Sequence, residues 1–197
     1  MNAYFNTNHV AGLLFTVTMM AWVMMEVSQR SAQPRRTGAT AVARVGGRIV
    51  VLACLIVTAA VVNLAPHVVP AATIRPGAVA FAAGMVVLLA GLVLRGWSFK
   101  TLGQYFTHTV MVSYDQPVIV TGPYRVLRHP SYAGLILAGL GIGLASANWA
   151  GLAGLMLLSI TALLWRIHIE ESALAATLGD RYRAYAAQHK RLVPLVW

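Results

Sequence analysis

The sequence predicts an all-α, polytopic integral membrane protein with about five transmembrane helices, the last two forming a helical hairpin, and a helical C-terminal tail in the cytosol. Composition is the first observation that leads to this prediction. Hydrophobic residues make up 58% of the 197 residues, charged residues only 10%, and the mean hydropathy is +0.70. A soluble domain carries about 25% charged residues. Most of the surface of this chain must therefore face lipid.

Five apolar runs are the second observation. They cover roughly residues 10–25, 49–64, 77–94, 132–147 and 150–165. Each is close to the shortest helix that crosses a hydrocarbon core of about 30 Å. Only a tight turn at Ala147, Asn148 and Trp149 joins the last two runs. The hairpin is expected to bring the residues just before 132 close to those just after 165.

The distribution of charge predicts the orientation. Segments 28–48, 95–130 and 166–197 contain fourteen of the fifteen basic residues, and only Arg75 lies elsewhere. Short loops rich in Arg and Lys stay in the cytosol. Five crossings then leave the N-terminus outside and the C-terminus in the cytosol. The bias of 13 Arg over 2 Lys is typical of a GC-rich prokaryotic genome, so we expect a prokaryotic plasma membrane.

The same charges exclude several classes of function. A net charge of +10 on a chain this apolar indicates contact with anionic membrane lipids. Nucleic-acid binding is not expected, because no basic stretch is interleaved with aromatic residues in a reader motif. The five acidic residues also lie in segments expected to face the cytosol. Transporters and pumps keep ionisable groups near the middle of their spans, so those classes are disfavoured.

Two other sequence patterns do not predict a binding site. The histidines lack the spacing of metal ligands and Cys54 is the single cysteine, so no metal site is predicted. Residues 139–143, Gly-Leu-Gly-Ile-Gly, imitate part of a dinucleotide-binding fingerprint but lie inside an apolar span. Small residues there predict close packing of helices.

The first polar cluster precedes the fourth run. Pro130 suits the first turn of a helix, so the residues before it are expected at a helix N-terminus, where amide groups and the helix dipole bind carboxylates. The alternative is that Arg128 and His129 anchor lipid headgroups, while Tyr124 and Tyr132 are interfacial aromatics.

The second polar cluster follows the fifth run. Arg166 and Glu170 are four residues apart and share a helix face. They form either a local ion pair or a functional couple, in which the Arg holds an anionic substrate and the Glu holds a cofactor. Residues 178–185, Leu-Gly-Asp-Arg-Tyr-Arg-Ala-Tyr, indicate a turn and then an amphipathic tail helix. This helix is expected to lie on the membrane surface or to close over the site.

Three blocks resemble the isoprenylcysteine carboxyl methyltransferase family of integral membrane, S-adenosylmethionine-dependent methyltransferases. They are Thr-Leu-Gly-Gln-Tyr-Phe-Thr at 101–107, Gly-Pro-Tyr with Arg-His-Pro-Ser-Tyr-Ala-Gly at 122–134, and Glu-Glu with Leu-Gly-Asp-Arg-Tyr-Arg-Ala-Tyr and Arg-Leu-Val-Pro at 170–194. The resemblance implies N-terminal transmembrane helices in residues 1–94 and a methyltransferase core with a cytosolic cofactor pocket in residues 95–197.

Family motifs imply roles for individual residues. The resemblance assigns binding of S-adenosylmethionine, and of its product S-adenosylhomocysteine, to Gln116, Val118, Ile119, Gly122, Tyr124, His129, Pro130, Tyr132 and Glu170. It assigns Arg166 to substrate binding and thereby to catalysis. The family usually has His-x-Leu-Val before the Gly-x-Tyr motif, whereas this chain has Gln-Pro-Val-Ile at 116–119, so an amide replaces an imidazole.

Methyl transfer from a sulfonium is a displacement, which requires alignment more than acid–base groups. A carboxylate acceptor needs no general base; for an amine or phenol, His129 is the first candidate. A prenylated protein fits the family, and the prokaryotic composition favours an isoprenoid, fatty-acyl or other lipophilic substrate that enters from the bilayer. Two alternatives remain, an NADPH-dependent membrane reductase of the sterol-reductase type and a non-catalytic scaffold.

Overall fold

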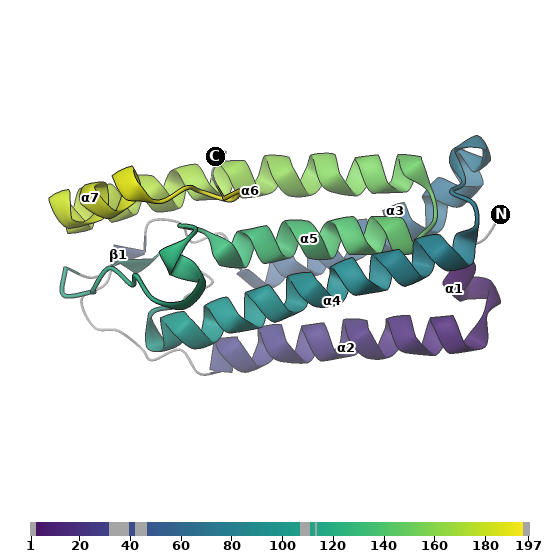
Figure 1. Cartoon of the computed structure of the whole chain (residues 1–197), viewed down its shortest axis with the longest axis horizontal. Helices are drawn as coiled ribbons and strands as arrows, with labels where there is room; N and C mark the ends of the chain where they lie inside the picture. Colours follow the sequence, from purple (N-terminus) through teal and green to yellow (C-terminus); the bar gives the residue numbers. More distant parts are fainter. Residues whose placement is uncertain (1–2, 32–39, 42–46, 107–110, 113, 195–197) are drawn as a thin grey trace.

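The computed structural model describes residues 3–31, 40–41, 47–106, 111–112 and 114–194. Within these ranges five long helices lie roughly along one axis (Figure 1): α2 (His9–Ser31), α3 (Gly47–Val68), α4 (Gly77–Leu102), α5 (Pro130–Ala145) and α6 (Trp149–Leu178). Helix α7 (Asp180–Gln188) follows α6 at the end opposite the N-terminus. The prediction of an all-α membrane protein is confirmed.

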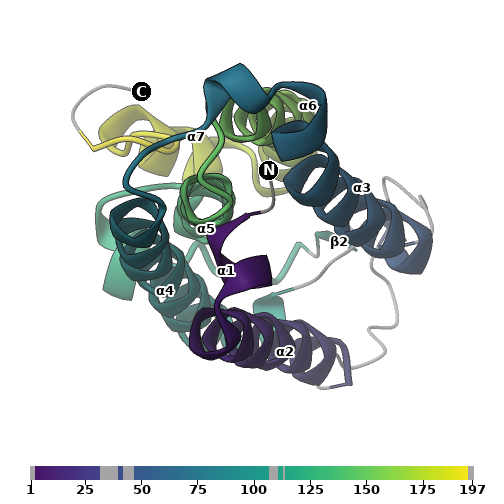
Figure 2. The same cartoon turned by 90° about the vertical axis from the view of Figure 1, so that its right-hand side faces the viewer.

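Short elements join the long helices. Helix α1 (Tyr4–Thr7) lies among the long helices at the N-terminal end (Figure 2), where Phe5 stacks on Phe15 of α2 at 4.4 Å between ring centroids. Single 3₁₀ turns form at η1 (Pro70–Ala72), η2 (Gly103–Tyr105) and η3 (Gly122–Arg125). Strands β1 (Thr40–Ala41) and β2 (Met111–Val112) form one antiparallel pair. The predicted loop residues Arg35, Arg36, Arg44 and Thr107 lie outside the described residues.

Each of the five apolar runs corresponds to one long helix, although the fourth run continues two residues past the end of α5. Segments His9–Gln29, Gly77–Tyr105 and Trp149–Leu178 are long and apolar enough to cross a membrane, whereas Ile56–Val68 and Pro130–Ala145 are shorter apolar helices. Apolar side chains point outward along the bundle: Val10, Val86, Val93 and Leu157 are each 68–70% exposed. A bilayer would cover this apolar surface.

One predicted boundary is wrong. The third span was expected to end at residue 94, with a loop from 95 to 130, but α4 continues to Leu102. Arg95 does not end the helix, because its charge is neutralised inside the bundle by Glu26 of α2, and Ser98 and Phe99 after it are also buried. The division predicted between residues 94 and 95 thus lies inside a continuous helix.

Glycines bring the backbones of α4 and α5 into contact. A Cβ atom on Gly141 of α5 would lie 2.4 Å from the backbone nitrogen of Leu88 in α4, and one on Gly84 would lie 2.4 Å from the nitrogen of Ala145. Near the other end of α5, a Cβ on Gly134 would lie 2.7 Å from the carbonyl oxygen of Gly91. The expectation that the Gly-Leu-Gly-Ile-Gly segment allows close helix packing is confirmed.

The predicted hairpin between α5 and α6 is also present. Asn148 is fully buried; its side-chain oxygen accepts from the N–H of Gly151 at 3.0 Å and its Nδ2 donates to the carbonyl of Val69 at 3.0 Å. It therefore caps α6 and ties the turn to the end of α3. At the other end of the hairpin, the start of α5 lies beside residues 166–171 of α6.

We predict that Gly141→Ala lowers the free energy of unfolding by about 1–3 kcal/mol, because the added methyl group must separate two backbones. Gly139→Ala is the matched control in the same helix, since a Cβ there meets only the flexible end of Met156 at 3.2 Å and the Ser159 hydroxyl at 3.4 Å. Denaturant titration of both variants in micelles measures the difference. Equal stability of the two would show that α4 and α5 do not depend on this contact.

Candidate active site

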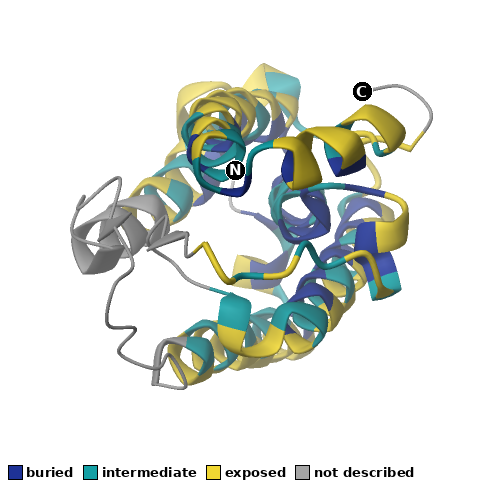
Figure 3. Cartoon of the chain, turned by 90° about the vertical axis from the view of Figure 1, so that its left-hand side faces the viewer, coloured by how far each residue is buried: buried dark blue, intermediate teal, exposed yellow. Residues whose placement is uncertain are grey.

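A pocket opens at the end of the bundle that carries α7, which Figure 3 views end-on. The end of α4 with η2, the segment 116–132, residues 166–178 of α6 and helix α7 contribute its walls. Its lining residues are Leu102, Tyr105, Phe106, Gln116, Pro117, Val118, Ile119, Tyr124, Arg128, His129, Ser131, Tyr132, Arg166, Glu170, Leu174, Leu178, Tyr182 and Tyr185. The pocket thus joins the two polar clusters of the sequence.

The structure brings together eight of the ten residues assigned by the resemblance. They line the pocket and are Gln116, Val118, Ile119, Tyr124, His129, Tyr132, Arg166 and Glu170. Gly122 and Pro130 shape the backbone beside it. Gly122 has φ +55° in η3 and packs against Thr101, and Pro130 is the first residue of α5.

Tyr132 connects the Arg and the Glu of α6. Its hydroxyl donates to Oε2 of Glu170 at 2.6 Å and accepts from Nε of Arg166 at 2.8 Å. The guanidinium carbon of Arg166 lies 6.0 Å from the centre of the Tyr132 ring. Arg166 and Glu170 share a helix face as expected, and a side chain from α5 fixes both of them inside the pocket.

Glu171 holds two arginines and a histidine around one carboxylate. Its Oε1 lies 3.0 Å from Nε2 of His129 and 3.1 Å from a terminal nitrogen of Arg128. Its Oε2 accepts from Nε of Arg191 at 3.0 Å. The side chain of Glu171 is only 12% exposed, so these contacts are weakly screened. They join the start of α5, the end of α6 and the C-terminal tail.

The tail closes one side of the pocket. The N–H of Arg128 donates to the carbonyl of Lys190 at 2.7 Å, and that of His129 donates to the carbonyl of Arg191 at 3.0 Å. The expectation that these amides bind a carboxylate is therefore wrong, because the tail carbonyls already occupy them. The predicted tail helix does close over the site, as α7.

Tyr185 of α7 strengthens this closure. Its hydroxyl donates to the carbonyls of Tyr124 at 2.9 Å and Leu127 at 3.3 Å. Burial raises the pKa of Tyr185 to about 12 and also raises the pKa of Tyr124 and of Tyr182. The pocket tyrosines outside the spans therefore remain neutral donors at physiological pH. Tyr182 and Tyr185 were not predicted as site residues, although their spacing of three puts them on one face of α7.

Three buried polar atoms in the described residues have no hydrogen-bond partner: Oε1 of Gln116, Nε of Arg128 and the hydroxyl of Tyr182. All three residues line the pocket. A buried polar group without a partner costs about 1–3 kcal/mol. The Gln116 oxygen can accept, the Arg128 nitrogen can donate, and the Tyr182 hydroxyl can do either. Together they indicate a site built for a polar ligand.

A family model, individual relatives and a solved structure match parts of this chain. Residues 82–176 match the model of the isoprenylcysteine carboxyl methyltransferase (ICMT) family. This segment, somewhat less than half of the chain, is similar to that family. The match begins within α4 and ends within α6, so it contains the glycine contact and nearly all of the pocket.

Individual relatives agree with the family match. A probable protein-S-isoprenylcysteine O-methyltransferase of Oryza sativa subsp. japonica is 32% identical over 120 residues, which are 57% of this chain and 60% of the rice protein. A protein-S-isoprenylcysteine O-methyltransferase of Tribolium castaneum is 32% identical over 115 residues, 57% of this chain and 41% of the insect protein. The chain thus spans about 60% of the length of the rice relative.

A solved structure resembles the fold as well. The eukaryotic intramembrane Ras methyltransferase ICMT matches with a TM-score of 0.61 and 25% identity, over 78% of this chain and 55% of that protein. The family match, the relatives and this structure favour a methyltransferase over a sterol-reductase-type enzyme or a scaffold.

We predict that Glu171→Gln lowers the free energy of unfolding by about 1–3 kcal/mol, because the guanidinium groups of Arg128 and Arg191 would then face an uncharged amide. Limited proteolysis should then cut the tail after α7 sooner. Asp180→Asn is the control, because Asp180 pairs with Arg183 at a fully solvated site, where the side chains are 97% and 68% exposed, and exposed pairs add little stability. Equal rates of proteolysis in the two variants would contradict the conclusion that Glu171 holds the tail against α5 and α6.

Proposed function

We propose that this protein transfers the methyl group of S-adenosylmethionine to a carboxylate on an isoprenylated or otherwise lipophilic substrate, at the cytosolic face of the membrane. The observation that carries the proposal is the pair Arg166 and Glu170, held by one tyrosine hydroxyl in a pocket at the end of apolar helices. The names of the relatives support the substrate class, since they describe O-methylation of isoprenylcysteine.

The polar lining of the pocket fits the proposed cofactor. S-adenosylmethionine presents an adenine amine, ribose hydroxyls, an ammonium and a carboxylate. The orphan oxygen of Gln116 is an acceptor for an N–H or O–H group, and the orphan Nε of Arg128 is a donor for a carboxylate. Glu170 can accept from hydroxyls or the ammonium. The amide that replaces the family's usual imidazole thus supplies a hydrogen-bonding atom of its own.

When bound, the cofactor supplies a methyl group on a positively charged sulfur. The protein's task is to hold the acceptor oxygen in line with that methyl group, since alignment accounts for a large part of the barrier. A carboxylate is already ionised, so no side chain needs to remove a proton. Arg166 is suited to fix it, because a guanidinium presents a planar fork of donors, and Tyr132 orients that fork through Nε.

The apolar surface near the pocket supports a substrate that arrives from the bilayer. Leu164 and Trp165, one turn or less before Arg166, are 40% and 62% exposed. A lipid chain could therefore lie along α6 with its polar end at the guanidinium. The basic residues 166–197 would keep this end of the bundle in the cytosol, where the methyl donor is made.

Glu170→Gln should weaken the binding of S-adenosylhomocysteine about tenfold, because the carboxylate accepts hydrogen bonds that an amide replaces with one weaker acceptor. Isothermal titration calorimetry of the purified protein in micelles measures this, with Asp180→Asn as an exposed acid-to-amide control. Unchanged affinity would remove Glu170 from the cofactor site. Binding of NADPH in place of S-adenosylhomocysteine would instead support the reductase alternative.

Arg166→Lys should lower the rate of methyl transfer to a prenylcysteine analogue by at least about tenfold and leave the affinity for S-adenosylhomocysteine nearly unchanged. The lysine keeps the charge but loses the fork that orients a carboxylate. Arg183→Lys, at an exposed position of α7, is the control. An unchanged rate would reduce Arg166 to a structural role, and a loss of cofactor affinity would mean that Arg166 supports Glu170.

A further inference from the structure

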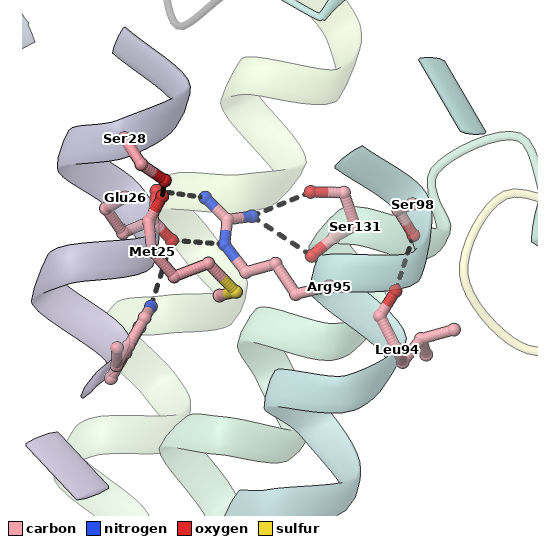
Figure 4. Close-up of polar contacts among 8 residues, drawn as sticks. Met25, Glu26, Ser28, Leu94, Arg95, Ser98 and Ser131 are labelled. Carbon is pink, nitrogen blue, oxygen red and sulfur yellow. Dashed lines mark hydrogen bonds and ion pairs between the residues drawn. The ribbon is translucent and has the colours of Figure 1, made fainter. Parts of the chain in front are cut away.

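No described residue of α2 lines the pocket, yet this helix carries a mostly buried acid. Glu26 of α2 forms a two-pronged ion pair with Arg95 of α4: one carboxylate oxygen contacts Nε, and the other accepts from a terminal nitrogen at 2.9 Å (Figure 4). Trp22 donates its indole N–H to the same carboxylate at 2.9 Å. Arg95 is 5% exposed and its guanidinium lies 4.6 Å from the centre of the Phe99 ring.

The other edge of this guanidinium reaches the pocket wall. The remaining terminal nitrogen of Arg95 donates to Oγ of Ser131 at 2.7 Å and to the carbonyl of Ser131 at 3.2 Å (Figure 4). Ser131 is 5% exposed, lines the pocket and lies in the first turn of α5, between His129 and Tyr132. A chain of contacts therefore runs from α2 through α4 to the turn of α5 that carries Tyr132 and follows His129.

Adhesion of α2 to α4 does not explain this arrangement. Burying two charges costs several kcal/mol, and apolar residues of similar size often hold two segments together as well or better. A leucine and a methionine would serve that purpose, but they could not donate to Ser131. What only the guanidinium supplies is a rigid fork with one edge on Glu26 and the other on the first turn of α5.

That turn packs against α4 through the close approach of Gly134 to Gly91, which is not a polar contact. Its Pro130 has no N–H, and the amides of Arg128 and His129 bond to the tail on the other side. The contact from Arg95 to Ser131 thus adds a polar link between this turn and α4. Because the Ser131 hydroxyl accepts from Arg95, its proton can be donated to a ligand in the pocket.

We propose that Glu26 and Arg95 are positioning residues, which fix Ser131 and with it His129 and Tyr132 in the pocket wall, and that Ser131 donates its hydroxyl to the bound ligand. The first long helix thereby supports the site at a distance. The ligand part of this proposal rests on the proposed function, whereas the positioning of the turn does not.

The test uses the double variant Glu26→Leu/Arg95→Met, which removes both charges and keeps apolar packing. Unfolding in micelles should occur at the wild-type temperature or above it, while S-adenosylhomocysteine binds about tenfold more weakly. Hydrogen–deuterium exchange should be faster in the peptide 128–134 and unchanged in α7. If Glu26 and Arg95 only held α2 against α4, the unfolding temperature and the affinity for S-adenosylhomocysteine would fall together. Wild-type affinity and wild-type exchange in the double variant would overturn the proposal.

Ser131→Ala is the second variant, and Ser98→Ala is its matched control. Both serines are buried, but the hydroxyl of Ser98 only bonds back to the carbonyl of Leu94 in its own helix. Ser131→Ala should weaken ligand binding and Ser98→Ala should not. Equal affinities would overturn the role of Ser131, and this comparison decides the matter even if the double variant fails to fold.

Failure of the proposed function has a different signature. A wild-type protein that binds no S-adenosylhomocysteine would refute the cofactor assignment and leave hydrogen exchange as the readout. Faster exchange at 128–134 in the double variant would then still support the positioning of this turn, and unchanged exchange would overturn it.

Discussion

The backbones of α4 and α5 touch at Gly84, Gly91, Gly134 and Gly141, and the position of the site depends on this contact. A helix pair that meets backbone to backbone at several glycines has a fixed spacing and register, because closely packed backbones cannot slide past one another easily. That register sets Arg95 beside Ser131 and places the first turn of α5 against the end of α4. In lipid, where helices gain nothing from hiding apolar surface from one another, such packing is a principal source of association.

Two acidic side chains pair with basic ones around this pair of helices. Glu26 neutralises Arg95 behind the pocket, and Glu171 gathers Arg128, His129 and Arg191 at its rim. Both carboxylates are mostly buried and both connect segments that are distant in the sequence. Glu170, the third acid of this region, faces the pocket and bonds to Tyr132. Two acids thus connect distant segments and the third lines the pocket.

Several site residues followed from the sequence because local rules apply to them. A Pro that starts a helix, an Arg and a Glu four residues apart, and a three-residue turn each have a short-range physical cause. The roles of Arg95, Arg128 and Tyr185 did not follow, because each depends on a partner that is distant in the sequence. The charge of Arg95 ended the apolar run, so a loop was expected there; its neutralisation by Glu26, 69 positions earlier, keeps that segment helical. The amides at 128 and 129 were expected to face a ligand for the same reason: the tail that occupies them lies about sixty residues away in the sequence.

By itself the sequence determined that the chain is a helical membrane protein, that its polar groups lie toward one end, and that residues 95–197 resemble a methyltransferase core. Composition, periodicity and the order of motifs carry that information, since each is a property of neighbouring residues. Only the tertiary structure decided which acid pairs with which base, which amides remain for a ligand, and that α2 belongs to the support of the pocket. Those outcomes depend on helix register and on distances between segments, and one side chain such as Tyr132 becomes a link between Arg166 and Glu170 only once two helices have packed.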